Sequence, residues 1–270
     1  MDDRGIGMFD SGFGGLTVAR ALIDLLPDED LVYFGDTARY PYGPRSLSDV
    51  REFAMQISRI LLDDHDVKMI VVACNTAAAA ALETLRFDLE VPVVGVVDPG
   101  VRAAVKVTRN GRVGVIGTAG TIGSGAYQRA AESLRAAVEL TSLACPGFVE
   151  LVEEGETGGE RAHAVVSDRL APLVDAGIDM LLLGCTHYPF LARTISDVVG
   201  REVVLVSSAD ETAFEIRSIL RDTGLGRRSG AGDGKGRHRF ISSGDVDWFR
   251  ELGGRLLGPE LDVVEPWVWK

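Results

Sequence analysis

The sequence predicts an α/β protein made of two similar doubly wound parallel-sheet domains that face each other across a central active-site cleft. Three observations lead to this prediction. Short β-branched runs alternate with stretches of helical period, the alternation restarts near the middle of the chain, and each half places a cysteine directly after a buried strand. Strands that alternate with helices imply right-handed crossovers and parallel sheets. The 270 residues suffice for two ordinary domains.

The first half predicts four strands separated by amphipathic helices, because its apolar residues change from short β-branched runs to helical spacing. Strands are expected at Gly5–Phe9, Leu31–Phe34, Lys68–Ala73 and Val93–Val97, and helices at Leu16–Leu26, Ser48–Leu62 and Ala77–Arg86. The tripeptide Asp98-Pro99-Gly100 then indicates a hinge out of the first domain.

The second half repeats the rhythm and is followed by a tail. Further strands are expected at Arg112–Ile116, Val138–Leu143, Met180–Leu183, Val203–Val206 and Arg239–Ser242, with helices at Glu211–Leu220 and Val246–Leu257. The tail is too short for a third domain, so we assign residues 1–97 and 208–270 to the first domain and 98–207 to the second. Gly224–Gly236, rich in glycine and arginine, is expected to be an exposed mobile loop.

Composition restricts the partners and the compartment. A formal net charge of −12 argues against direct nucleic-acid binding and against an anionic membrane surface. No apolar run reaches the length of a membrane span, and acidic residues precede any apolar stretch at the N-terminus. Three distant cysteines, Cys74, Cys145 and Cys185, predict free thiols and a reducing cytoplasm rather than a disulfide framework.

The cysteine segments do not match the common catalytic patterns. Zinc would need three or four Cys, His or carboxylate ligands, and no second cluster completes Cys185 and His187. The chain has no G-x-S-x-G elbow and no phosphate-binding loop signature. No lysine setting suggests pyridoxal phosphate. We therefore expect neither a metal nor an organic cofactor.

The two halves nevertheless place their thiols in similar settings. Cys74 lies 64 positions after Asp10, and Cys185 lies 67 positions after Thr118. Each of these cysteines precedes polar residues that open an expected helix. A helix N-terminus lowers a thiol pKa from about 8.5 towards neutrality, and its free N–H groups bind carboxylates. Two such thiols suit proton removal from one face of a carbon and proton delivery to the other.

A purely structural interpretation competes at every position. A cysteine on a strand is more often a buried small hydrophobe than a nucleophile, and we assign that role to Cys145. Asp10, Ser11, Asn75 and Thr76 could be turn or capping residues, and His187 a core histidine. Taken singly, each structural interpretation is favoured. The occurrence of all these residues at two matching strand ends favours a site.

At these residues the sequence resembles the glutamate racemases of the aspartate/glutamate racemase superfamily. The resemblance runs along the whole chain and includes Phe9–Thr17, Tyr33–Asp36, Pro41–Gly43, Ala73–Ala77, Val115–Thr118, Cys145-Pro146, Leu151–Glu153, Gly184–Pro189 and Ser243–Asp245. The two cysteines are shared with aspartate and hydantoin racemases. Cys185-Thr186-His187-Tyr188-Pro189 is the discriminating segment, because aspartate racemases resemble a Cys-Thr-Glu version there.

The resemblance implies specific roles. Cys74 and Cys185 match the two catalytic cysteines, Asp10 and His187 are expected to assist the nearby thiols, and Glu153 is a further catalytic candidate. The substrate-binding residues that it implies are Asp10, Ser11, Pro41, Tyr42, Gly43, Asn75, Thr76, Thr118, Thr121, Thr186 and His187. Glu150 and Ser207 depart from the family, which usually has proline and aspartate at these positions.

The leading hypothesis is a cofactor-independent isomerase that interconverts L- and D-glutamate by a two-cysteine, two-base mechanism. The resemblance implies a cytoplasmic enzyme, a homodimer, that supplies D-glutamate for peptidoglycan and so serves cell wall biogenesis and cell shape. One alternative is a racemase of another amino acid, chiefly aspartate. A second is a protein-binding role, the inhibition of DNA gyrase, for which the sequence offers no motif.

Overall fold

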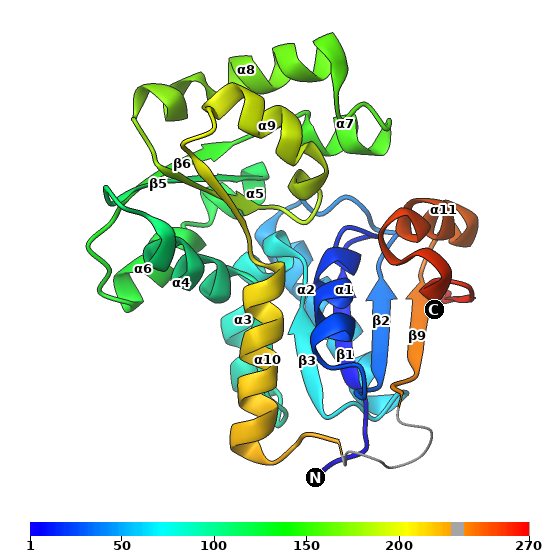
Figure 1. Cartoon of the computed structure of the whole chain (residues 1–270). Helices are drawn as coiled ribbons and strands as arrows, with labels where there is room; N and C mark the ends of the chain where they lie inside the picture. The colour runs from blue at the N-terminus through cyan, green and yellow to red at the C-terminus, as the bar shows by residue number, and fades with distance from the viewer. Residues whose placement is uncertain (228–234, 270) are drawn as a thin grey trace. The chain divides into compact units, whose positions relative to one another are not determined.

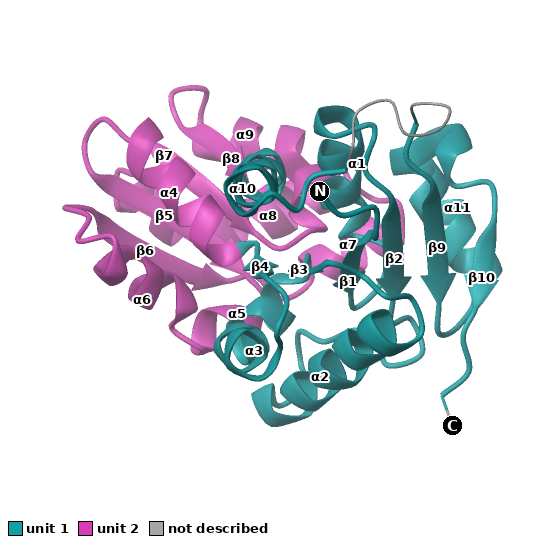
Figure 2. Ribbon diagram, turned by 90° about the horizontal axis from the view of Figure 1, so that it is seen from below, with its two compact units in different colours: residues 1–96, 209–270 teal, residues 97–208 magenta. Residues whose placement is uncertain are grey.

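The computed structural model describes residues 1–227 and 235–269, and these form two compact units. The first unit comprises Met1–Val96 and Ala209–Lys270, and the second comprises Val97–Ser208 (Figure 2). Each boundary lies one residue from the expected position. The chain thus leaves the first unit once, builds the second, and returns.

The first unit contains a six-stranded, fully parallel sheet. Its strand order is β10-β9-β2-β1-β3-β4, and β1 and β2 stand side by side in Figure 1. The strands are β1 (Ile6–Asp10), β2 (Leu31–Gly35), β3 (Met69–Val72), β4 (Val93–Gly95), β9 (His238–Ser242) and β10 (Val264–Pro266). Every residue of β1, β2 and β3 is buried, as expected for a parallel sheet covered on both faces.

Helices cover both faces of this sheet (Figure 2). One face carries α1 (Leu16–Leu25), α10 (Ala209–Thr223) and α11 (Val246–Leu257), and the other carries α2 (Leu47–Asp63) and α3 (Asn75–Asp88). A short 3₁₀ helix, Gly258–Glu260, follows α11. In α2, Ser46 caps the first turn by accepting a hydrogen bond from the Asp49 N–H at 3.1 Å, and Val50, Ala54, Ile57 and Leu61 form the buried stripe.

The second unit has a four-stranded parallel sheet in the order β6-β5-β7-β8. The strands are β5 (Arg112–Gly117), β6 (Glu139–Ala144), β7 (Met180–Gly184) and β8 (Val204–Ser207). The helices are α4 (Val97–Val107), α5 (Ala119–Gly123), α6 (Ala126–Ser133), α7 (Phe148–Glu153), α8 (Gly159–Asp175) and α9 (Ala192–Val199), with the 3₁₀ helix η1 (Tyr188–Leu191) before α9. Helices α4 and α6 pack together, as do α8 and α9 (Figure 1).

The two sheets share one topology. In each, the first strand pairs with the second on one side and the third on the other, giving β2-β1-β3-β4 and β6-β5-β7-β8. The direction of winding reverses between β1 and β3 in the first unit, and between β5 and β7 in the second. Ligands of open α/β sheets bind outside the carboxyl ends of strands at such a reversal. The topology therefore predicts a ligand site at the carboxyl ends of β1 and β3 in the first sheet, and at those of β5 and β7 in the second.

The tripeptide Asp98-Pro99-Gly100 lies just after the boundary between the units, but it forms the first turn of α4 and not the irregular linker that its composition suggests. Proline is accommodated there because the first N–H groups of a helix have no intrahelical acceptor. Gly100 serves close packing: a Cβ atom at this position would lie 3.2 Å from Leu182 Cδ1 and 3.2 Å from Ser208 Cβ.

The tail differs from expectation in one further respect. A second strand, β10, follows α11 and pairs with β9 in parallel register. It has only three residues, and one of them is Pro266. Both its length and its composition therefore prevent its prediction from the sequence. The expected loop Gly224–Gly236 falls largely on residues 228–234, which lie outside the described residues. Within the described ranges, none of the helices combines the length and apolar character that a membrane span requires.

Candidate active site

In the first unit, the residues implicated by the sequence gather at the carboxyl ends of β1 and β3. Asp10 is the last residue of β1, and Cys74 follows β3 as the N-cap of α3. Both are buried, and the Cys74 Sγ–H donates to Ser11 Oγ over 3.8 Å. The strand reversal thus brings Asp10, Ser11 and Cys74 together from segments far apart in the chain.

The pKa of Cys74 differs from the expectation of an acidified thiol. Burial, reinforced by the negative charge of Asp10, raises the pKa of Cys74 to about 12. The Ala77 N–H in the first turn of α3 and the hydrogen bonds from Ser11 act in the opposite direction. The helix N-terminus therefore lowers the pKa of Cys74, as expected, but desolvation of the thiolate raises that pKa by a larger amount. With this pKa, Cys74 is a thiol near pH 7.

The turn after β1 is held from two sides. Asp10 Oδ1 accepts a hydrogen bond from the Gly12 N–H at 2.7 Å, and the buried Tyr33 hydroxyl donates to the Gly12 carbonyl oxygen at 3.1 Å. Gly15 allows this close approach, since a Cβ there would lie 2.7 Å from Asp10 Cβ and 2.8 Å from the Tyr33 hydroxyl oxygen. The turn fixes Ser11 beside Cys74. Tyr33 lies within a family-like segment, but only the fold reveals its contact with the Gly12 carbonyl oxygen.

The Pro41–Gly43 segment lies in the loop that leaves β2. Pro41 follows a cis peptide bond and is exposed, whereas Tyr42 is fully buried. The Tyr42 hydroxyl donates to the carboxylate of Asp36, the residue directly after β2. Burial, followed by the negative charge of Asp36, raises the pKa of Tyr42 well above its usual value, and the charge of Cys74 makes a smaller contribution in the same direction. Because the Tyr42 hydroxyl already donates its proton to Asp36, the Pro41–Gly43 segment would contact a ligand through its backbone groups.

Asn75 and Thr76 form the first turn of α3 rather than preceding it. The helix begins at Asn75, two residues before the expected start, and both side chains are buried. Their backbone N–H groups belong to the turn whose amide groups lack intrahelical acceptors. The first unit therefore combines a thiol, a carboxylate and an anion-binding helix end at one edge of its sheet.

The second unit repeats this arrangement with different neighbours. Cys185 directly follows β7 and is buried. Its Sγ lies 3.9 Å from Nδ1 of His187, which is also buried. Burial lowers the pKa of His187 to about 4, so the imidazole is neutral near pH 7. A neutral imidazole can accept a hydrogen bond from the neighbouring thiol, although the lowered pKa makes it a weak base.

The helix expected directly after Cys185 begins later. His187 is the N-cap of η1, a four-residue 3₁₀ helix with Pro189 in its first turn, and α9 begins only at Ala192. The Tyr188 N–H donates to the Cys185 carbonyl oxygen at 3.1 Å, which makes Cys185 the start of a tight turn. A helical segment with Pro189 in its first turn therefore follows Cys185 as expected, but its first turn is a 3₁₀ helix and the α-helix begins later.

The remaining candidates of this unit lie around the carboxyl ends of β5 and β7. Thr118 caps α5, accepting from the Thr121 N–H at 3.3 Å, and the two hydroxyl oxygens are 3.0 Å apart. Thr186, which separates Cys185 from His187 in the sequence, is buried. Gly117 pairs with Gly184 across β5 and β7, which brings the Thr118 and Cys185 segments to neighbouring strand ends.

Two further residues remain: Cys145 has a structural role, and Glu153 is still a catalytic candidate. Cys145 follows β6 and is buried, and burial raises its pKa to about 12. Its carbonyl oxygen accepts the Tyr188 hydroxyl at 3.2 Å, which ties β6 to the Cys185 turn. Glu153 is the half-buried last residue of α7, and its catalytic role stays a prediction. All three cysteines carry free thiols.

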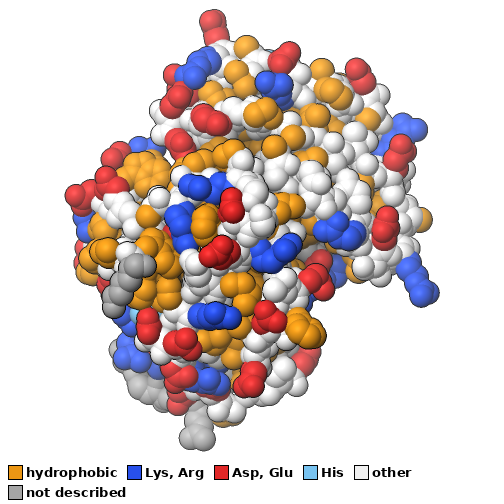
Figure 3. Space-filling view, turned by 180° about the vertical axis from the view of Figure 1, so that it is seen from behind, with side chains coloured by type: hydrophobic (Ala, Val, Ile, Leu, Met, Phe, Trp, Pro, Cys, Tyr) orange, Lys and Arg blue, Asp and Glu red, His pale blue; other side chains and the backbone are white. Residues whose placement is uncertain are grey.

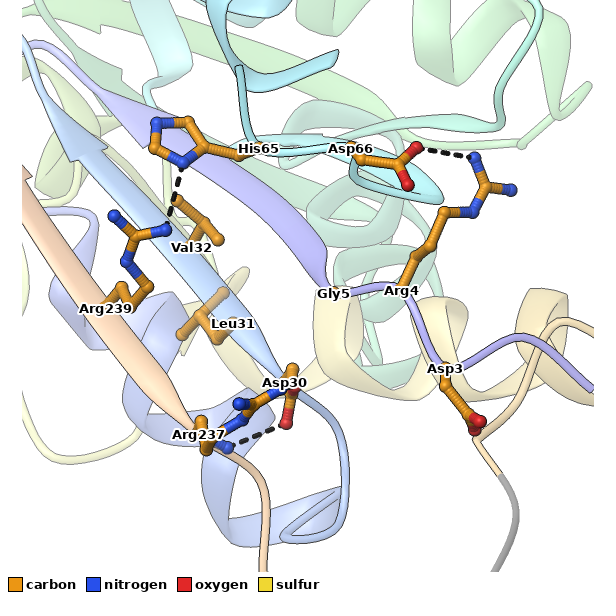
Figure 4. Close-up of a pocket in the computed structure, with 10 residues that line it drawn as sticks. All are labelled: Asp3, Arg4, Gly5, Asp30, Leu31, Val32, His65, Asp66, Arg237 and Arg239. Carbon is orange, nitrogen blue, oxygen red and sulfur yellow. Dashed lines mark hydrogen bonds and ion pairs between the residues drawn. The ribbon is translucent and has the colours of Figure 1, made fainter. Parts of the chain in front are cut away.

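The cavity in Figure 4 lies elsewhere. It has a volume of about 360 Å³ and opens at the amino ends of β1, β2 and β9, away from Asp10 and Cys74. Three arginines in its lining are matched by three aspartates, and Arg237, for example, pairs with Asp30 at 3.1 Å. This charge balance makes it a poor receptor for an anion. Among the described residues, no three His, Cys, Asp or Glu side chains could jointly hold a metal ion.

Comparison with known proteins gives a consistent assignment. Residues 15–213 match the profile of the Asp/Glu/Hydantoin racemase family. The chain is 51% identical to a glutamate racemase of Acidothermus cellulolyticus over 261 residues, covering 96% of this chain and 97% of the relative. It is 47% identical to a glutamate racemase of Bacillus cereus, covering 97% and 96% of the two chains.

Solved structures extend the likeness to the fold. Glutamate racemase isoform RacE1 from Bacillus anthracis superimposes with a TM-score of 0.91 at 41% identity, covering 100% of this chain and 98% of that one. A glutamate racemase from Francisella tularensis, solved in complex with D-glutamate, gives a TM-score of 0.90 at 33% identity with the same coverage. The chain therefore belongs to the Asp/Glu/Hydantoin racemase family.

Proposed function

We propose that this protein is a glutamate racemase, an isomerase that interconverts L- and D-glutamate through two cysteines, without a metal or an organic cofactor. The observation that carries the proposal is the repeated topology: each sheet reverses its winding beside a strand that ends in a cysteine, Cys74 or Cys185. The close relatives named glutamate racemases support glutamate as the substrate.

In the proposed mechanism the two cysteines act on opposite faces of the α-carbon of one glutamate. One thiolate removes the α-proton, and the thiol of the other cysteine protonates the opposite face. Each thiol has a polar neighbour that would assist its proton transfer: Cys74 has the Asp10 carboxylate, whose negative charge raises the pKa of the thiol, and Cys185 has His187, 3.9 Å away. Asp10 and His187 thus act through the cysteines.

The α-proton of an amino acid is very weakly acidic, so the carbanion that forms needs stabilisation. Buried hydroxyl and amide groups of Ser11, Asn75, Thr76 and Thr186 can hold the α-carboxylate onto which charge is delocalised. The N-terminus of α3 adds the positive end of a helix dipole, which favours negative charge. Thr118, Thr121 and the Pro41–Gly43 loop complete the proposed binding surface, with Glu153 as a further proton-transfer candidate.

The resting state of Cys74 fits one half of this cycle directly. Its pKa of about 12 keeps it a thiol, the form that delivers a proton. For the reverse reaction Cys74 must ionise, and the ammonium group of a bound amino acid would favour the thiolate by its positive charge. Substrate binding therefore helps to create the base that the reaction needs.

Circular dichroism of L-glutamate incubated with the purified enzyme tests the proposal. We expect the signal to decay to zero in enzyme dialysed against EDTA and treated with hydroxylamine, with L-aspartate unchanged in a parallel sample. Faster decay of aspartate would support the alternative substrate. An aspartate racemase homologue from Pyrococcus horikoshii shares only 16% identity, so that likeness concerns the fold alone. Glutamate activity that requires added metal or pyridoxal phosphate would contradict the two-thiol chemistry.

The cellular setting belongs to the same proposal. We infer a cytoplasmic enzyme that supplies D-glutamate for peptidoglycan and acts as a homodimer. The almost fully exposed Phe87, at 91%, is a side chain that a partner subunit could cover, and light scattering of the purified protein tests the dimer. On the face in Figure 3, acidic and basic side chains are interspersed. DNA gyrase is the alternative partner, for which the sequence offers no motif, and pull-down with an inactive variant tests it.

A further inference from the structure

Asp36 is a fully buried carboxylate that the proposed mechanism does not use. It directly follows β2, at the same sheet edge as Asp10 and Cys74. Its backbone N–H donates to the Asp10 carbonyl oxygen at 3.0 Å, which joins the two strand ends. A buried carboxylate is costly unless its oxygens are fully hydrogen-bonded, so its partners show what it organises.

The two oxygens of Asp36 bind different parts of the chain. Oδ2 accepts from the loop after β2, from Arg39 Nε at 2.6 Å and from the Tyr42 hydroxyl. Oδ1 accepts from the C-terminal part, from the Ser243 hydroxyl at 2.7 Å and from Trp269 Nε1 at 3.1 Å. One carboxylate therefore links the Pro41–Gly43 loop to segments more than 200 residues away.

Further contacts strengthen the same link. The Arg39 guanidinium lies between two aromatic rings, its Cζ 3.6 Å from the ring centre of Trp269 and 4.1 Å from that of Phe53. Ser243 Oγ also accepts the Ala38 N–H at 3.1 Å. The loop is thus held by the C-terminal segment through charge, hydrogen bonds and stacking.

We propose that Asp36 is a positioning residue that couples the C-terminal segment to the substrate-binding loop, with Trp269 as its distal anchor. The proposal rests on the proposed function, because it takes Pro41–Gly43 as a substrate-binding segment. Tyr42 is the connection. Its hydroxyl donates a hydrogen bond to Asp36, and the charge of Cys74 contributes to the raised pKa of Tyr42. The last residues of the chain thereby set the geometry of a loop near the reacting thiol.

Two neighbouring tryptophans provide a matched pair of variants. Trp269→Phe removes the hydrogen bond to Asp36 but keeps an aromatic ring over Arg39. Trp267→Phe is the control, because Trp267 Nε1 is buried without a hydrogen-bond partner among the described residues. Ser243→Ala is a second test variant, which removes the other donor to Oδ1.

The first readout does not depend on catalysis. Hydrogen exchange of a peptide covering residues 37–46 reports the amides of Ala38, Arg39 and Arg45, all hydrogen-bonded within this network. We expect exchange in Trp269→Phe and Ser243→Ala to be about tenfold faster than in wild type, as for loss of one hydrogen bond to a charged group. Trp267→Phe should exchange within about twofold of wild type.

The second readout is the Michaelis constant. Because enantiomers have equal free energies, kcat/KM must be the same in both directions, so KM and kcat are compared separately. We expect Trp269→Phe to raise KM for L- and D-glutamate about threefold or more while kcat changes less, since loop position affects binding. Trp267→Phe should keep the wild-type KM.

Failures of the two proposals are distinguishable. A wild-type enzyme that does not racemise glutamate would refute the proposed function, whereas exchange in residues 37–46 would still report the coupling. Unchanged exchange in both Trp269→Phe and Ser243→Ala, or equal acceleration in Trp267→Phe, would refute the role of Asp36. Faster exchange with an unchanged KM in an active enzyme would show that the loop does not bind substrate, and this too would overturn the proposal.

Discussion

At Cys74 two physical effects oppose each other. The N-terminus of α3 stabilises the thiolate, while burial and the Asp10 carboxylate destabilise it, and the second pair prevails. The sequence could indicate the helix end but not the burial, since desolvation depends on how the strand ends close around the sulfur. An expectation of an activated thiol was therefore correct about the position and wrong about the resting pKa.

This balance can be tested with Asp10→Asn. Removing the negative charge should lower the pKa of Cys74, so its alkylation by iodoacetamide at pH 8.5 should become faster than in wild type. Cys145 is an internal control, because burial alone raises its pKa to about 12 and its alkylation rate should not change. Peptide mass mapping gives both rates. Slower or unchanged alkylation of Cys74 would contradict the assigned cause.

His187 makes stability depend on pH. Burial lowers its pKa from 6.5 to about 4, so between these values the unfolded chain binds a proton that the folded protein does not. Its contribution is present above pH 6.5 and is lost as pH falls towards 4, by about 1.4 kcal/mol per pH unit. Compared with His187→Gln, wild-type protein should lose more unfolding free energy in urea titrations over this window. Parallel curves would show that His187 titrates normally.

At the scale of elements, most strands and helices could be predicted from periodicity, because a parallel sheet requires continuous apolar strands. The exceptions have physical causes. Asp98-Pro99-Gly100 has turn composition but begins α4, where Gly100 packs closely against Leu182. The strand β10 and the 3₁₀ turn after Cys185 are too short to carry a period. Tyr33 and Asp36 gain their roles from tertiary hydrogen bonds that no local pattern encodes.

The amino ends of β2 and β3 are joined by a buried ion pair. Lys68 Nζ lies 2.5 Å from Glu29 Oε2, and the Lys68 side chain is fully buried. Glu29→Gln would leave an uncompensated buried ammonium, so we expect unfolding to require about 3 kcal/mol less. Fluorescence-detected urea unfolding reports this unit, because all three tryptophans lie in it.

The matched control for this variant is an exposed pair on α11. Glu251→Gln removes a salt bridge to Arg255 whose side chains are 72% and 53% exposed, and it should cost less than about 0.5 kcal/mol. An equally small effect of Glu29→Gln would show that the buried pair contributes nothing net to the first unit.

At the scale of the whole molecule, the repeated strand order explains where the candidate catalytic residues lie. Each unit presents a cysteine at its winding reversal, and each cysteine has a buried polar neighbour, Asp10 or His187. The similar spacing of Asp10–Cys74 and Thr118–Cys185 predicted this repetition from the sequence. The central claim that follows is a division of labour, in which each cysteine serves one enantiomer.

Elimination of HCl from the D and L enantiomers of threo-3-chloroglutamate by Cys74→Ser and Cys185→Ser tests this claim most directly. Serine is far too weak an acid to replace a thiol base, so each variant should lose glutamate racemisation. Each keeps one working base, however, and removal of the α-proton by that base suffices to expel chloride. We predict that the two variants prefer opposite enantiomers of the chloro compound. The same preference in both, or racemisation by either at nearly the wild-type rate, would contradict the two-base account.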